Sequence, residues 1–95
     1  MIIPKTYTQF GRTFKVVPEK SSHLSAYNGI AHPDQNLVVL DMALPRTLVE
    51  HNFIHEMLHN QMSLMQKFDL YNDENFINTL SGLIHQALTT GKGSI

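Results

Sequence analysis

The chain of 95 residues contains no cysteine. It can therefore form neither disulfide bonds nor a thiolate metal site, and any metal ion has to be bound by histidine and carboxylate side chains. An excess of charge is also missing, because 7 Lys and Arg residues stand against 8 Asp and Glu residues and no basic run occurs. This balance argues against a protein that binds the phosphate backbone of nucleic acids.

Long apolar runs are absent as well. No stretch approaches the length of a membrane span, and residues 1–10 lack the apolar core of a signal peptide. We therefore expect a cytoplasmic protein with no membrane partner. The hydrophobic fraction of 42% is still sufficient for a globular fold, and the length predicts a single domain over residues 1–95.

The first half of the chain predicts a small, mainly antiparallel sheet. Strands rich in β-branched and apolar residues are expected at residues 13–17 and 36–41, and residues 26–31 are expected to form either a strand or a hairpin. The first of these ends at Pro18, and the pair Asn28-Gly29 favours a tight hairpin turn. The continuous apolar run in residues 37–40 indicates a strand covered on both faces.

The second half predicts two helices, so that the whole pattern is typical of an α+β fold. The first helix starts at Pro45, or alternatively at a capping box formed by Thr47 and Glu50, and extends to about Met65. The second helix is expected from near Asn72 to about Thr90, where Gly91 stops it. Residues 91–95 are expected to form a frayed tail.

The first helix contains the motif His55-Glu56-Met57-Leu58-His59, an H-E-x-x-H sequence. Residues four apart lie on the same face of a helix, so both imidazoles can reach one ion. Two neutral imidazoles and a carboxylate suit Zn²⁺, and Glu56 can act as general base toward a metal-activated water. On the same helix, Asn52 and Asn60 are expected to face water.

The third ligand has to come from outside the motif helix. His51 is unsuitable, because His51, His55 and His59 together span roughly 12 Å of helix axis at about 1.5 Å per residue. On the second helix, one polar column lies beside the apolar face, formed by Glu74, Asn78, Ser81 and His85. Glu74 is the best candidate in this column, although an acidic residue in a first turn is also favoured by the helix dipole alone. Asp73 and His85 remain alternative or accessory ligands.

The chain resembles the minimal zincin-like metallopeptidases of gluzincin type that bacteriophages and prophages often encode. The matching elements are Tyr27-Asn28-Gly29, the strand at residues 37–41, the Pro45-led helix with its motif, and Asp73-Glu74-Asn75-Phe76. The resemblance covers roughly residues 25–90, and the pentapeptide motif is its specific part. It implies that zinc is bound by His55, His59 and Glu74, and that Glu56 is the base.

Two functional hypotheses follow. The first is a zinc-dependent metallopeptidase that acts on a peptide or protein substrate, with residues 37–41 aligning the peptide and Tyr71 or His85 donating to the oxyanion. The second is a non-catalytic zinc-stabilised module of a phage that binds a host or phage protein, its metal closed off by His85 or Asp73. If the protein is phage-encoded, its expected location is the host cytoplasm. A chance motif in a metal-free fold is a third reading.

Overall fold

The computed structural model describes residues 1–19 and 28–95. Its strands are β1 (Thr6–Gln9), β2 (Arg12–Glu19), β3 (Gly29–His32) and β4 (Leu37–Asp41), and its α-helices are α2 (Arg46–Leu64), α3 (Phe68–Tyr71) and α4 (Glu74–Thr90). A short 3₁₀-helix, η1 (Pro33–Gln35), connects β3 to β4. The sheet is followed by helices, which confirms the α+β class.

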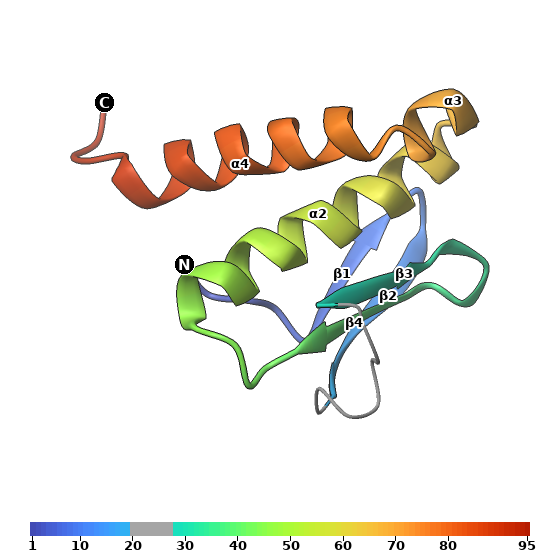
Figure 1. The fold of residues 1–95 in the computed structure, drawn as a ribbon, viewed down its shortest axis with the longest axis horizontal. Helices are drawn as coiled ribbons and strands as arrows, with labels where there is room; N and C mark the ends of the chain where they lie inside the picture. Colours follow the sequence, from blue (N-terminus) through green and yellow to red (C-terminus); the bar gives the residue numbers. More distant parts are fainter. Residues whose placement is uncertain (20–27) are drawn as a thin grey trace.

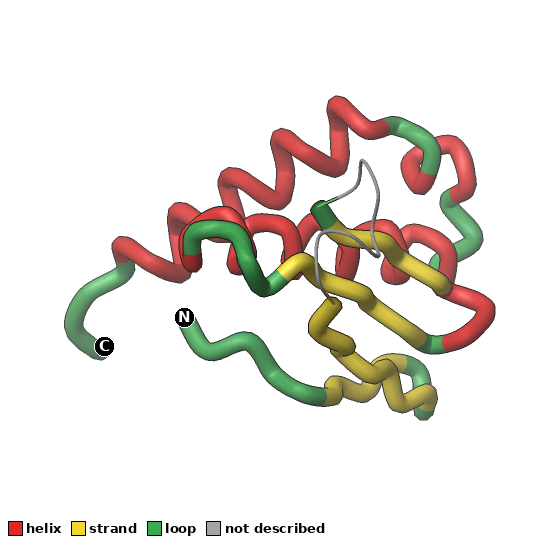
Figure 2. Tube along the Cα trace, turned by 60° about the horizontal axis from the view of Figure 1, so that its bottom comes forward, coloured by secondary structure: helices red, strands yellow, loops and turns green. Residues whose placement is uncertain are grey.

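The four strands form one mixed sheet in the order β1-β2-β4-β3, and Figure 2 shows them side by side. The β1–β2 and β3–β4 pairs are antiparallel, whereas β2 and β4 are parallel. The sheet is thus mainly antiparallel, as expected. Strand β4 is internal and paired on both sides, while β3 forms an edge of the sheet.

The core lies between one face of the sheet and α2. Figure 1 shows α2 along the sheet, with α4 on the opposite side of α2. Val38 and Leu40 alternate along β4 toward the core, and α2 contributes a stripe of two neighbouring rows in which residues lie four apart. The buried cluster consists of Val38, Leu40, Val49, Phe53, Ile54, Leu58, Met62 and Ile77. Since Ile77 comes from α4, the same apolar contact holds α4 against α2.

The expected strands at residues 13–17 and 36–41 are confirmed, but the structure extends the first through Pro18 to Glu19. Proline is tolerated there because β1 pairs with β2 only as far as Lys15, so that Pro18 lies where β2 no longer has β1 beside it. Two short elements, β1 and α3, were not predicted.

The expectation of a hairpin turn at Asn28-Gly29 is wrong. Gly29 is the first residue of β3 and pairs with Leu40 of β4, and the connection between these strands is η1. Residues 26 and 27, which belonged to the same expected element, lie outside the described residues, as does most of the expected loop at 18–25.

Both long helices lie close to their expected positions. Pro45 is the N-cap residue of α2, directly before Arg46, and the helix ends at Leu64. The alternative start at Thr47 is wrong. Helix α4 is capped by Asp73, whose carboxylate accepts a hydrogen bond from the Phe76 N–H at 3.0 Å. Within the described residues, none of the helices combines the length and apolar composition that a bilayer-spanning segment requires.

Candidate metal centre

Three side chains from two helices converge at the end of α2 that faces the start of α4. Nε2 of His55 lies 3.3 Å from Nε2 of His59, because the two residues are one helical turn apart. Glu74, the first residue of α4, places Oε2 at 3.1 Å from His55 Nε2 and Oε1 at 2.9 Å from His59 Nε2. One ligand atom from each residue therefore lies within 4.8 Å of the other two.

These distances fit a divalent ion of the size of zinc. Four ligands at about 2.0–2.1 Å from zinc form a tetrahedron with edges of about 3.3–3.4 Å. The N–N distance of 3.3 Å matches one such edge, and each imidazole nitrogen has one Glu74 oxygen beside it, Oε2 at 3.1 Å from His55 and Oε1 at 2.9 Å from His59. Burial, followed by the nearby charge of His59, lowers the pKa of His55, which favours the neutral imidazole that a metal ion requires.

Glu56 lies beside this group and faces β3. Its carboxylate accepts a hydrogen bond from the backbone N–H of Ala31. Burial and then the charge of Glu74 raise the pKa of Glu56 to about 7, against the opposing effect of the Ala31 N–H. A carboxyl group with such a pKa can exchange a proton near neutral pH, which is the property of a general base.

Gly29 allows the backbone of β3 to approach Glu56 closely. A Cβ atom added at this position would stand 3.1 Å from Glu56 Cγ and 3.1 Å from the carbonyl oxygen of Val39. Any side chain at Gly29 would therefore push against the general-base candidate. Glycine at position 29 thus permits this close approach of the backbone, whereas the sequence had suggested that it forms a turn.

The converging side chains line an open cleft of about 810 Å³ between β3, α2 and the start of α4. The lining residues are Asn28, Gly29, Ile30, Ala31, Asn52, His55, Glu56, His59, Tyr71, Asn72, Glu74 and Asn78. The exposed fraction of the side chain is 16% for His55 and 8% for His59 but 69% for Glu74. Solvent therefore reaches the group from the side of Glu74.

Tyr71, the last residue of α3, lies in this cleft as the sequence suggested. Its ring packs edge-on against the ring of His59, with 5.1 Å between centroids. Burial, followed by the charge of Glu56, raises the pKa of the phenol. Tyr71 thus stays a protonated hydrogen-bond donor at the wall of the cleft.

The alternative ligands Asp73 and His85 do not join the group. The carboxylate of Asp73 caps α4, and His85 lies far along the helix, where its Nε2 is 2.9 Å from Oε1 of Glu50. His51 is not solvent-facing, because its Nε2 lies 2.9 Å from the fully buried hydroxyl of Ser81. The polar column of α4 therefore meets α2 in three successive contacts, of which the one at Glu74 is the candidate metal centre.

Glu50 anchors the far end of this column. Besides His85, its carboxylate contacts the Met1 amino group at 3.1 Å and Arg46 Nε at 3.2 Å, and the residue is only 7% exposed. The hydrogen bond from His85 first, and then the one from the Met1 amino group, lowers the pKa of Glu50 to about 2. The expected capping role of Glu50 is replaced by these contacts.

The contacts of the Glu50 carboxylate predict that the protein loses stability in acid. A carboxylate whose pKa falls from about 4.5 unfolded to about 2 folded stabilises the protein above pH 4.5, and the contribution disappears as the pH falls toward 2. Glu50→Gln should therefore flatten the dependence of the free energy of unfolding on pH between 4.5 and 2, measured by urea unfolding. The exposed Asp69→Asn variant is the control, and an unchanged slope in Glu50→Gln would contradict the prediction.

The other polar residues named in the sequence analysis do not belong to the three-residue metal group. Asn60 does not face water but is fully buried, and its Nδ2 donates to the carbonyl oxygen of Leu37 at 3.1 Å, which ties α2 to β4. Asn52 is half-buried at the cleft rather than in water. Tyr27, which belongs to the elements of the resemblance, lies outside the described residues. The hydrogen bond from the Ala31 N–H to Glu56 could not be predicted from the sequence, because every residue except proline has a backbone N–H.

Comparisons of the chain with protein-family models, with curated protein sequences and with solved structures returned no match. The geometry of the cleft and the H-E-x-x-H motif are therefore the observations that bear on function.

Proposed function

We propose that this protein is a zinc-dependent metallopeptidase. The observation that carries the proposal is the convergence of His55, His59 and Glu74 in one cleft with the partly buried Glu56 beside them. A structural metal site does not need Glu56, whereas a hydrolase needs a base at this place. The proposal agrees with the resemblance of the motif to zincin-like peptidases of phages.

His55, His59 and Glu74 would hold the zinc ion. Zinc bound there would supply a Lewis acid that activates water and polarises a carbonyl group. The donor set of two imidazoles and one carboxylate, without a fourth protein ligand among the described residues, is the set found in catalytic zinc sites.

Glu56 would perform the proton transfers of peptide hydrolysis. As the oxygen of the attacking water bonds to the carbonyl carbon, Glu56 accepts a proton from that water. As the C–N bond breaks, the same carboxyl group donates its proton to the leaving nitrogen, so that an acid and an amine are released. The Ala31 N–H keeps the carboxyl group in place between the two transfers.

Strand β3, rather than β4, would align the substrate. The expectation that residues 37–41 bind the peptide fails, because both edges of β4 are occupied by β2 and β3. Asn28 accepts a hydrogen bond from the Asp41 N–H, and in the antiparallel alternation the backbone groups of Gly29 and Ala31 then point to the free edge. An extended peptide could add to this edge next to Glu56.

The non-catalytic module is the weaker candidate. It required His85 or Asp73 to close the coordination shell of the metal. Both side chains are engaged elsewhere, His85 with Glu50 and Asp73 with the backbone of α4. The cleft thus stays open at the place where a substrate would bind.

Metal removal tests the proposal. We expect the purified protein to contain about one zinc ion per chain and to hydrolyse casein or an unfolded peptide. A chelator should abolish the hydrolysis, and zinc added after removal of the chelator should restore it. Elemental analysis gives the stoichiometry and a fluorogenic casein assay gives the activity. Hydrolysis that persists after complete zinc removal would contradict the proposed mechanism.

A further inference from the structure

The cleft is unusually rich in side-chain amides. Four of its lining residues are asparagines, namely Asn28, Asn52, Asn72 and Asn78, whereas Ile30 and Tyr71 are the large side chains with apolar parts. Binding sites for bulky apolar groups are lined mainly by apolar and aromatic residues. A ligand of this cleft would instead obtain its specificity from hydrogen bonds to neutral amides.

Asn52 and Asn78 both line the cleft, Asn52 from α2 and Asn78 from α4. Two contacts bracket them, because His55 meets Glu74 on one side and His51 meets Ser81 on the other. Since the helices run antiparallel, Asn52 of α2 and Asn78 of α4 fall between these contacts. Asn52 is also one helical turn before Glu56, so this pair of amides adjoins the candidate general base.

The amide group of Asn52 has unused hydrogen-bonding capacity. Its Nδ2 atom is buried and has no hydrogen-bond partner. An unsatisfied buried donor destabilises the folded protein, so a ligand oxygen that accepts from it gains more than it would at a solvated amide. No hydrogen bond holds this nitrogen, and the terminal torsion of asparagine is soft, so the N–H group can turn toward the cleft.

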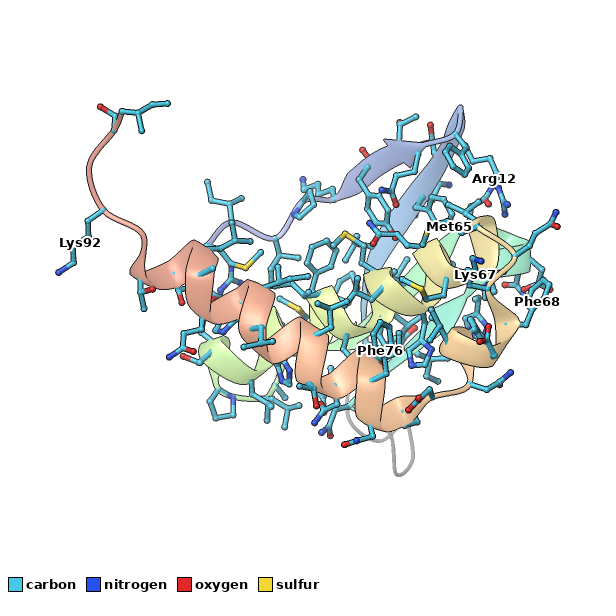
Figure 3. The ribbon with its side chains drawn as sticks, turned by 90° about the horizontal axis from the view of Figure 1, so that it is seen from above. Arg12, Met65, Lys67, Phe68, Phe76 and Lys92 are labelled. Carbon is cyan, nitrogen blue, oxygen red and sulfur yellow. The ribbon has the colours of Figure 1, made fainter. Side chains whose placement is uncertain are left out.

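The charges around the cleft disfavour an acidic segment of the substrate, because Glu56 and Glu74 line it. Among the residues that the structure describes, no Lys, Arg or Asp lines the cleft. The cations labelled in Figure 3 (Arg12, Lys67 and Lys92) belong to β2, to the residue before α3 and to the tail. No described cation is therefore in place to pair with a terminal carboxylate or an acidic side chain of a bound peptide.

We propose that the cleft selects an internal segment of a peptide in which a residue next to the scissile bond carries a short amide or hydroxyl side chain, held by Asn52 and Asn78. The inference rests on the proposed peptidase function. It gives Asn52 the role of a binding residue that recognises the neighbouring side chain and takes no part in the proton transfers.

The test uses two matched peptides, Ala-Ala-Asn-Asn-Ala-Ala and Ala-Ala-Leu-Leu-Ala-Ala, each with a fluorophore and a quencher at its ends. With the zinc-loaded full chain, kcat/KM should be at least about tenfold higher for the asparagine peptide, the size expected for one to two neutral hydrogen bonds. Asn52→Leu should reduce this ratio to about one or invert it. The matched control Asn75→Leu, an exposed residue of α4 outside the cleft, should leave the ratio unchanged.

A binding measurement separates this inference from the function on which it rests. The same peptides are titrated into ¹⁵N-labelled zinc-loaded Glu56→Gln protein, and the side-chain amide signal of Asn52 is followed. We expect the asparagine peptide alone to shift this signal. Selective binding without hydrolysis by the wild type would overturn the peptidase and keep the subsite, whereas hydrolysis without preference would overturn the subsite. Absence of both would overturn both.

Discussion

Replacing Glu56 by glutamine is expected to lower the rate of peptide hydrolysis by about 10²- to 10⁴-fold, the usual contribution of a positioned general base. Glutamine has nearly the same shape and can still occupy the space between Gly29 and the Ala31 N–H, but it cannot accept the proton. The metal ligands are other residues, so the zinc content should stay at the level of the wild type. Steady-state kinetics and elemental analysis on the same preparations measure both quantities.

The matched control is Asp69→Asn, which makes the same chemical change at an exposed carboxylate of α3 that does not line the cleft. Its activity should equal that of the wild type. Equal activity in Glu56→Gln and the wild type would remove Glu56 as the base. No activity in either protein, with zinc bound in both, would favour the non-catalytic module instead.

The second large effect is expected for His59→Ala. Zinc at 100 times its Kd stabilises the native state by about 2.7 kcal/mol. At about 4–8 °C per kcal/mol for a domain of this size, it should raise the Tm of the wild type by more than about 10 °C. In His59→Ala this zinc-dependent increase should disappear together with the bound metal, because the imidazole is one of three ligands and is only 8% exposed. Calorimetry with and without zinc measures the shift.

His32→Ala provides the control for the loss of an imidazole, since His32 lies on β3 outside the three-residue group. It should retain both the metal and the zinc-dependent increase in Tm. A zinc stoichiometry of one in His59→Ala would refute the assignment of the ligands. Glu74→Ala should weaken zinc binding as well, and it leaves the two imidazoles of α2 in place.

The parts of the site that lie on one helix could be predicted from the sequence. The spacing of the apolar residues along α2 predicts which face of the helix is buried. The same helical geometry places His55 and His59 on one face, one turn apart. Glu74 was one of three candidates, because sequence spacing cannot tell which part of the polar column of α4 meets which turn of α2. The packing of Ile77 against the core sets this alignment and brings Glu74 to the two imidazoles.

The parts that depend on pairing between distant segments could not be predicted. The edge position of β3 follows from the parallel pairing of β2 with β4, which no local pattern encodes. The Ala31 N–H and the close approach at Gly29 follow from that position. Strand β1 has only four residues, two of them threonines that point away from the helices, and so it lacks the apolar alternation that marks longer strands.

The unequal exposure of the three ligand side chains has a consequence for metal exchange. Glu74 is 69% exposed and, among the residues that the structure describes, contacts the two imidazoles, whereas His55 and His59 are largely buried in the wall of the cleft. Once the bond between Glu74 and the ion breaks, a single rotamer change of this exposed side chain would open the coordination shell. Under the proposed function, the ion would leave and enter past this carboxylate, so that Glu74 rather than the two imidazoles would govern the rate of metal exchange.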